Sequence, residues 1–238
     1  MEYMFRKKPE IQYESVITSQ PNLITKSKSH IPDWYKKILS YKDNEIFSKE
    51  NMYFNKTVKH CMPFLDSLTI GYMVEIPYDI YVKNDNGVPF LSWRFENPDL
   101  APSWRPEISH ENIVPVGHYP MEYTWRFCAS FSIPKGYSII LTHPFNRNDL
   151  PFTTLTGIID GSHVTSYKTK FPFYIKDGYE GIIKQGTPIA QLIPFRQEKW
   201  KLKQKKGLSE IGELQAEAGS FTLAGWYKKH FWTKKDYD

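Results

Sequence analysis

Two short stretches decide the fold class of this 238-residue chain: Thr156-Gly-Ile-Ile-Asp160 and Gly186-Thr-Pro-Ile-Ala-Gln-Leu-Ile-Pro-Phe195. In each, β-branched and other apolar residues are interrupted by glycine, proline or a polar residue, which is typical of short strands joined by tight turns. Working outward, residues 133–141 and 171–175 predict two further strands. We therefore expect residues 131–195 to form one β-rich unit. The side chains expected in its core are Ile158, Ile159, Ile189, Ala190, Leu192 and Ile193.

The sequence before this unit predicts an extended arm followed by strands. Residues 1–30 are polar and broken by prolines, with one strand expected within 11–17, and the proline-led stretch 32–39 predicts a short helix. Between Thr57 and Val82 we expect two or three strands. Asn84-Asp-Asn-Gly87 tolerates positive φ between two alternating runs, and so predicts a β-hairpin of residues 78–82 and 90–95.

The remaining segments set the expected domain organisation. Residues 97–122 contain five prolines, which predicts a long loop or a chain crossing between subunits. Residues 209–218 begin with a capping serine and are followed by a glycine, so they predict a helix. The expected organisation is an arm with a short helix at 1–56, a β-rich core at 57–203, and a helix with a basic aromatic tail at 204–238.

Composition favours a globular protein, and the distribution of apolar residues indicates its location in the cell. Hydrophobic residues make up 40% of the chain and aromatic residues 16%, which is enough for a core and indicates further surface to cover. The N-terminal sequence lacks the apolar core of a signal peptide, and no apolar run has the length of a membrane span. We expect the protein to stay in the cytoplasm of the cell that makes it, with no membrane partner.

Charged and metal-binding residue types carry weak patterns. The net charge of +5 comes from lysine clusters at 199–206 and 228–235, and without ordered arginines these favour a solvated face over a nucleic-acid interface. The two cysteines are far apart, which indicates free thiols in a reducing compartment. The histidines show no metal-ligand spacing, so no metal site is predicted. The histidines considered were His110, His118, His143 and His163.

The order of these strands resembles the trimeric dUTPase and dCTP deaminase superfamily. The similarity covers residues 131–195: the Gly-hydrophobic-hydrophobic-Asp stretch and the Gly-x-x-Ile-Ala-Gln stretch are similar to its third and fourth motifs, and residues 133–141 to the strand before its second. The resemblance implies an all-β fold: a dUTPase-like β-clip, a distorted barrel or jelly-roll-like arrangement, with short peripheral helices and extended arms. It also implies a homotrimer.

The resemblance implies site residues one position at a time. Asp160 stands where the family positions the attacking water, although an aspartate after a strand also caps turns. Asn146 and Arg147 stand near the phosphate-binding motif, without its serines. His163 replaces the tyrosine that stacks under the sugar, and Gln191 belongs to the fourth motif. Asp160 is thus the catalytic candidate, and Asn146, Arg147, His163 and Gln191 are the ligand-binding candidates.

A second resemblance sets the biological context. Residues 31–37, 57–72 and 142–147 look like segments of a protein family encoded by tailed bacteriophages, marine ones in particular, and this implies an origin but no activity. Two functional classes follow. The favoured one is a non-enzymatic phage protein, a virion or assembly component or a binding protein, which needs no cofactor. The alternative is a divergent nucleotide hydrolase that uses Asp160 and Mg²⁺. It is the second choice because a working hydrolase site would require several parts that this sequence lacks.

Overall fold

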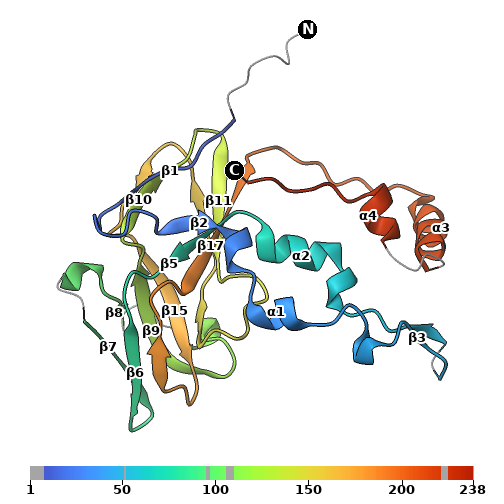
Figure 1. Cartoon of the computed structure of the whole chain (residues 1–238). Coiled ribbons are helices and arrows are strands. Elements are labelled where there is room, and N and C mark those ends of the chain that lie inside the picture. Colours follow the sequence, from blue (N-terminus) through green and yellow to red (C-terminus); the bar gives the residue numbers. More distant parts are fainter. Residues whose placement is uncertain (1–7, 51, 95–96, 106–109, 221–224, 238) are drawn as a thin grey trace. The chain divides into compact units, whose positions relative to one another are not determined.

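The computed structural model describes residues 8–50, 52–94, 97–105, 110–220 and 225–237 (Figure 1). Contacts group the chain into two compact units: unit 1 contains residues 1–30 and 71–197, and unit 2 contains residues 31–70 and 198–238. These boundaries differ from those expected at 57 and 203. The reason lies in unit 2, where Asp66 accepts hydrogen bonds from the side chains of Trp232 and Lys235, 166 and 169 residues further along the chain.

Unit 1 is built from antiparallel sheets, which confirms the all-β prediction; its described strands form open sheets and no closed barrel. The five-stranded sheet has the order β13-β11-β17-β5-β2, and the four-stranded sheet the order β12-β15-β9-β8. Their bounds are Gly157–Asp160 (β13), Tyr137–Thr142 (β11), Pro188–Arg196 (β17), Tyr72–Glu75 (β5) and Ile24–Lys26 (β2), then Phe152–Thr154 (β12), Lys170–Lys176 (β15), His118–Arg126 (β9) and Ser103–Trp104 (β8).

Two three-stranded sheets complete unit 1. One joins the N-terminal strand to the middle of the chain in the order β1-β10-β14, and the other has the order β16-β6-β7. In the second, β6 and β7 pair from Ile80 with Trp93 to Asp85 with Val88, which confirms the predicted hairpin. The bounds are Gln12–Ser15 (β1), Ala129–Ser132 (β10), Val164–Thr165 (β14), Gly181–Ile183 (β16), Ile80–Asp85 (β6) and Val88–Trp93 (β7).

The proline-rich stretch 97–122 contains more regular structure than the sequence predicted. It holds the 3-10 turns Pro98–Leu100 (η4) and Glu111–Ile113 (η5), the strand β8 and the first residues of β9. Residues 106–109 lie outside the described part. Pro98 is accommodated because it begins η4, at the position where the missing N–H is not needed.

The two strands that decided the fold class lie on either side of β11. β13 pairs with β11 from Ser138–Asp160 to Leu141–Gly157, and β17 pairs along the other edge of β11. Ile189, Ala190, Leu192 and Ile193 on β17 are buried as expected. Ile159 is half-buried against the core, but the prediction for Ile158 was wrong, since its side chain is 66% exposed. β13 is an edge strand, so alternate side chains on it point to solvent.

Aromatic residues fill the core under the four-stranded sheet. The rings of Trp125 and Phe173 stack with centroids 3.6 Å apart, and Phe152 packs edge-on against both. The indole N–H of Trp125 donates to Thr154 Oγ1 at 2.9 Å, so this fully buried ring has its polar atom satisfied. Much of the aromatic content therefore serves the core of unit 1.

Unit 2 consists of short helices and one small β-hairpin. Of the two or three strands expected between Thr57 and Val82, β5 and β6 are present. The first part of this stretch instead forms the 3-10 turn Val58–His60 (η3) and the helix Met62–Thr69 (α2), because Pro63 suits a first helical turn and Leu68 supplies a buried contact. The other elements are Asp33–Lys37 (α1), Phe47–Ser48 (β3), Tyr53–Phe54 (β4), Leu208–Ser220 (α3) and Trp226–His230 (α4). The predicted helices at 32–39 and 209–218 correspond to α1 and α3.

Candidate functional site

Asp160 ends the edge strand β13, directly opposite Ser138 of β11. Its Oδ1 accepts hydrogen bonds from Ser138 Oγ at 2.7 Å and from Gln197 Nε2 at 3.2 Å, and Gln197 Nε2 also donates to Ser138 Oγ at 2.8 Å. The carboxylate is exposed. Asp160 therefore ties β13 to β11 and to the end of β17, and its described bonds go to neighbouring side chains.

The turn after Asp160 is set by Gly161. A Cβ on this residue would lie 2.3 Å from the carbonyl oxygen of Pro134, so the backbone approaches too closely for any side chain. Gly161 N–H donates to the Tyr137 carbonyl at 2.8 Å. His163 follows in this turn with an exposed side chain. Close packing of the backbone thus explains Gly161, the second glycine of the Gly-Ile-Ile-Asp-Gly sequence.

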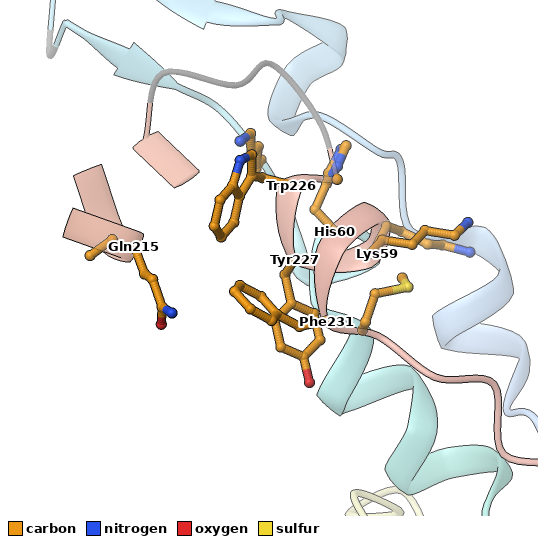
Figure 2. A pocket seen from close by; sticks show the side chains of 11 residues that line it. Lys59, His60, Gln215, Trp226, Tyr227 and Phe231 are labelled. Carbon is orange, nitrogen blue, oxygen red and sulfur yellow. The ribbon is translucent and has the colours of Figure 1, made fainter. Parts of the chain in front are cut away.

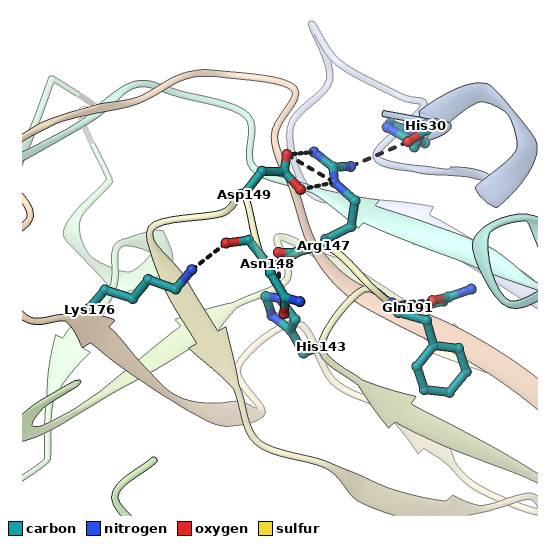
Figure 3. Close-up of polar contacts among 8 residues, drawn as sticks. His30, His143, Arg147, Asn148, Asp149, Lys176 and Gln191 are labelled. Carbon is teal, nitrogen blue, oxygen red and sulfur yellow. Dashed lines mark hydrogen bonds and ion pairs between the residues drawn. The ribbon is translucent and has the colours of Figure 1, made fainter. Parts of the chain in front are cut away.

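Arg147 lies in the loop that follows β11, and its guanidinium is bonded to Asp149 and to the carbonyl of His30 (Figure 3). Its Nε donates to Asp149 Oδ1 at 2.9 Å, its Nη2 donates to Asp149 Oδ2 at 2.9 Å, and its Nη1 donates to the carbonyl of His30 at 3.3 Å. The side chain is 11% exposed. A forked Arg–carboxylate pair of this kind is among the stronger hydrogen-bonded contacts, so an incoming phosphate would have to compete with Asp149.

Asn146, in the same loop, and Gln191, on β17, have different environments. Asn146 is exposed and adopts φ 58°, the left-handed conformation that asparagine tolerates in turns. Gln191 is fully buried on β17, where its Oε1 accepts the backbone N–H of Phe145 at 2.9 Å. Gln191 therefore fixes the start of the loop to the sheet and has no exposed surface for a ligand.

His143, which opens the same loop, is held as a neutral ring. Its Nε2–H donates to the Arg147 carbonyl at 3.2 Å, and its Nδ1 accepts the backbone N–H of Thr154 at 3.3 Å. Burial lowers the pKa of His143 to about 4, an effect that the nearby Lys176 and Arg147 reinforce against the hydrogen bond to the Arg147 carbonyl and the charge of Asp149. The sequence pattern gave no signal for this role, because it depends on what surrounds the ring.

The structure does not bring the predicted site residues together. Asp160 lies beside Ser138 at the start of β11, while Asn146 and Arg147 follow Thr142 at its end. Thr142 lies four residues beyond Ser138 along β11, which corresponds to about 13 Å at ~3.3 Å per residue. Within unit 1, the catalytic candidate and the phosphate-binding candidates thus stand at opposite ends of one strand.

A pocket in unit 2 was missed by the sequence analysis (Figure 2). Its volume is about 690 Å³, and aromatic and basic side chains line it. The signal was present in the basic aromatic tail, where Trp226-Tyr-Lys-Lys-His-Phe231 repeats aromatic residues at helical spacing. The lining residues are Lys56, Lys59, His60, Met62, Gln215, Ala216, Gly225, Trp226, Tyr227, Lys228 and Phe231.

A second feature of unit 2 is a run of exposed apolar side chains. Trp200 and Leu202, in an extended segment, are 87% and 105% exposed, and Ile211 and Leu214 on α3 are 51% and 68% exposed. Lysines alternate with the apolar residues of the extended segment. Exposed apolar side chains that gather into one patch mark interaction surfaces.

The residues that the structure describes contain no group of three or more His, Cys, Asp or Glu side chains placed to hold a metal ion. Among the helices that the structure describes, none is long and apolar enough to span a membrane.

No protein-family model matches the chain, and no curated protein matches it. Among solved structures, the chain is similar to a point mutant of the dUTPase from phage phi11 of S. aureus, described for its coordination of a structural Mg(II) ion, with 16% sequence identity. The match covers 44% of this chain and 97% of the dUTPase chain, with a TM-score of 0.26. At that TM-score the likeness carries no argument about activity, metal binding or assembly.

Proposed function

We propose that this chain is a phage-encoded, non-enzymatic protein whose β-rich unit serves as a scaffold, in a virion, in its assembly or as a binding protein. The observation that carries the proposal is the exposed apolar run of unit 2. Covering one leucine or isoleucine contributes about 1.5–3 kcal/mol, so Trp200, Leu202, Ile211 and Leu214 together favour a bound state over a solvated one. A protein that works by association gains from such a surface.

The environment of the predicted catalytic residues supports the same reading. Arg147 is paired with Asp149, Gln191 anchors a backbone N–H, and Asp160 braces two neighbouring strands. Each of these three side chains thus makes contacts that stabilise the fold. Phosphoryl chemistry needs positioned cations around the phosphates, and separating Arg147 from Asp160 by the length of β11 works against it.

We further infer that the protein forms a homo-oligomer, a trimer, in the host cytoplasm or in the virion. The same exposed side chains supply the self-association surface. The test is light scattering at micromolar concentration on the native chain and on the double variant Leu202→Ser, Ile211→Ser. The native chain should give the mass of a trimer and the double variant a smaller mass.

The control for this test is Ile158→Ser, which removes an apolar side chain that is 66% exposed from unit 1. It should leave the mass unchanged. A native chain that stays monomeric would contradict self-association through this surface, and an equal effect of Ile158→Ser would show that the surface is not specific.

The alternative, a divergent nucleotide hydrolase, draws on one observation: the Asp160 carboxylate is exposed at a sheet edge beside a hydroxyl and an amide. A lone carboxylate offers little to Mg²⁺, which would then be held mainly by the phosphates of the nucleotide. The test is an assay of the common deoxynucleoside triphosphates with Mg²⁺, for the native chain and Asp160→Asn. We expect equal, background rates. Turnover that Asp160→Asn abolishes would replace the non-enzymatic proposal with the hydrolase.

A further inference from the structure

The pocket of unit 2 has an aromatic wall built by α4. Trp226 and Phe231 pack edge-on with ring centroids 5.0 Å apart, and Tyr227 and Phe231 lie 6.2 Å apart. Figure 2 shows these rings gathered at the hollow, with Gln215 of α3 also lining it. Tyr227 and Phe231 are 46% and 48% exposed, so their faces are open to a planar group.

The C-terminal segment is anchored within unit 2, which gives this wall a fixed place. The indole Nε1–H of Trp232 donates to both carboxylate oxygens of Asp66 on α2, at 3.0 and 2.9 Å, and Lys235 Nζ donates to the same carboxylate at 2.8 Å. These contacts follow α4 directly. The aromatic wall is therefore held by a residue of α2, close to the η3 and α2 residues that line the same pocket.

The charge of the lining is of one sign. Lys56, Lys59 and Lys228 line the pocket, and no carboxylate is among the described lining residues. Lys59 Nζ lies 4.5 Å from the centre of the Tyr35 ring and donates to the Lys36 carbonyl at 3.3 Å, so its ammonium is held against the protein. Lys56 and Lys228 are exposed. Such a lining attracts an anion and disfavours a cation.

His60, one of the lining residues, also contains a buried polar atom. The Nε2 of His60 is buried and has no hydrogen-bond partner among the described residues. The ring is fixed by packing against Tyr41, with centroids 4.9 Å apart. A buried polar atom without a partner is costly, and a ligand that supplied one would remove that cost.

We propose that this pocket binds a nucleobase carrying a phosphate. The aromatic wall accepts a planar ring by stacking, the lysines neutralise the phosphate, and His60 supplies a hydrogen bond. Aromatic platforms combined with positive charge are how proteins hold bases without reading sequence. The volume of about 690 Å³ lies within the range of small-molecule sites. The proposal does not rest on the proposed function, because the pocket lining does not include Trp200, Leu202, Ile211 or Leu214 and binding requires no turnover.

Two sources share this chemistry: a free nucleotide and an exposed base of a single-stranded nucleic acid. The full chain is titrated, by tryptophan fluorescence and calorimetry, with ATP, with a ten-nucleotide single-stranded oligodeoxyadenylate and with inorganic triphosphate. We expect ATP or the oligonucleotide to bind, and inorganic triphosphate to bind more weakly than either. Binding of ATP assigns the pocket to a free nucleotide, and binding of the oligonucleotide alone assigns it to a single strand.

The variants separate this pocket from unspecific charge. Trp226→Ala should weaken binding by about 5- to 150-fold, the fold-change that corresponds to ~1–3 kcal/mol for one stacked base, and Trp226→Phe should restore much of it. Trp200→Ala removes a tryptophan that is 87% exposed and does not line the pocket, so it should leave affinity unchanged. Equal losses in Trp226→Ala and Trp200→Ala would overturn the proposal.

The contribution of the lysines is tested with a second pair of variants. Lys228→Gln should weaken binding of the oligonucleotide and reduce the slope of log K against log salt concentration by about 0.7, while Lys229→Gln, the next residue of α4 and not part of the lining, should not. The proposal fails if neither ATP nor the oligonucleotide binds the native chain. It also fails if inorganic triphosphate binds as tightly as ATP, since the aromatic wall would then contribute nothing.

Discussion

Acidification should destabilise unit 1 through His143. The folded ring accepts the Thr154 N–H at Nδ1 and donates to the Arg147 carbonyl from Nε2, so both nitrogens are used in the neutral form. A second proton would go onto Nδ1 and face an N–H donor. Together with burial, this agrees with a folded pKa of about 4, below the value of about 6.5 for an unperturbed histidine.

The sign and the size of the effect follow from proton linkage. The unfolded chain binds a proton at His143 as the pH falls below about 6.5, whereas the folded chain does so near pH 4. The stabilisation is therefore complete above pH 6.5 and is lost as the pH falls from 6.5 to 4. Between pH 7 and pH 5 the free energy of unfolding should fall by about 2 kcal/mol from this group alone.

The measurement is urea unfolding of the native chain and of His143→Gln at pH 7 and pH 5, followed by tryptophan fluorescence. The variant should be less stable at pH 7 but should lose about 2 kcal/mol less on acidification. His163→Gln, which removes an exposed imidazole, controls for the general loss of a histidine. A variant His143→Gln with the same pH dependence as the native chain would refute the assignment of a buried neutral ring.

Three further outcomes are expected. Ile159→Asp should destabilise unit 1 by about 2–4 kcal/mol in the same unfolding assay, because it places a charge against the core, whereas Ile158→Asp on the same strand should be nearly neutral; equal effects would contradict the assigned faces. Gly161→Ala should lower the melting temperature, since its Cβ would meet a backbone carbonyl oxygen at 2.3 Å, and an unchanged value would show that the turn can shift. Iodoacetamide should modify the exposed Cys61 quickly and Cys128 only after unfolding, because burial raises the pKa of Cys128 to about 12; mass spectrometry of the native protein reads this out.

The sequence by itself determined the elements whose signal is local. A short apolar run that follows turn residues predicted β17, and the alternation of apolar residues predicted β6 of the β6–β7 hairpin, because both signals appear directly in the chain. Turn residues that tolerate positive φ predicted the hairpin connection. The helical pattern of 209–218 predicted α3, although Ser209 and Gly219, which were expected to bound it, both lie within Leu208–Ser220. These features depend on neighbours within a few positions, so a single sequence contains what is needed to predict them.

The tertiary structure decided what depends on partners distant in sequence. Whether Ile158 or Ile159 faces the core depends on β13 being an edge strand, and whether Arg147 could meet a phosphate depends on Asp149 and on the carbonyl of His30, 117 residues away. The neutral state of His143 arises from burial and from two backbone groups that no spacing pattern reveals. The pocket of unit 2 likewise requires two segments far apart in the chain to meet, and only the folded protein places aromatic faces and lysines around one cavity.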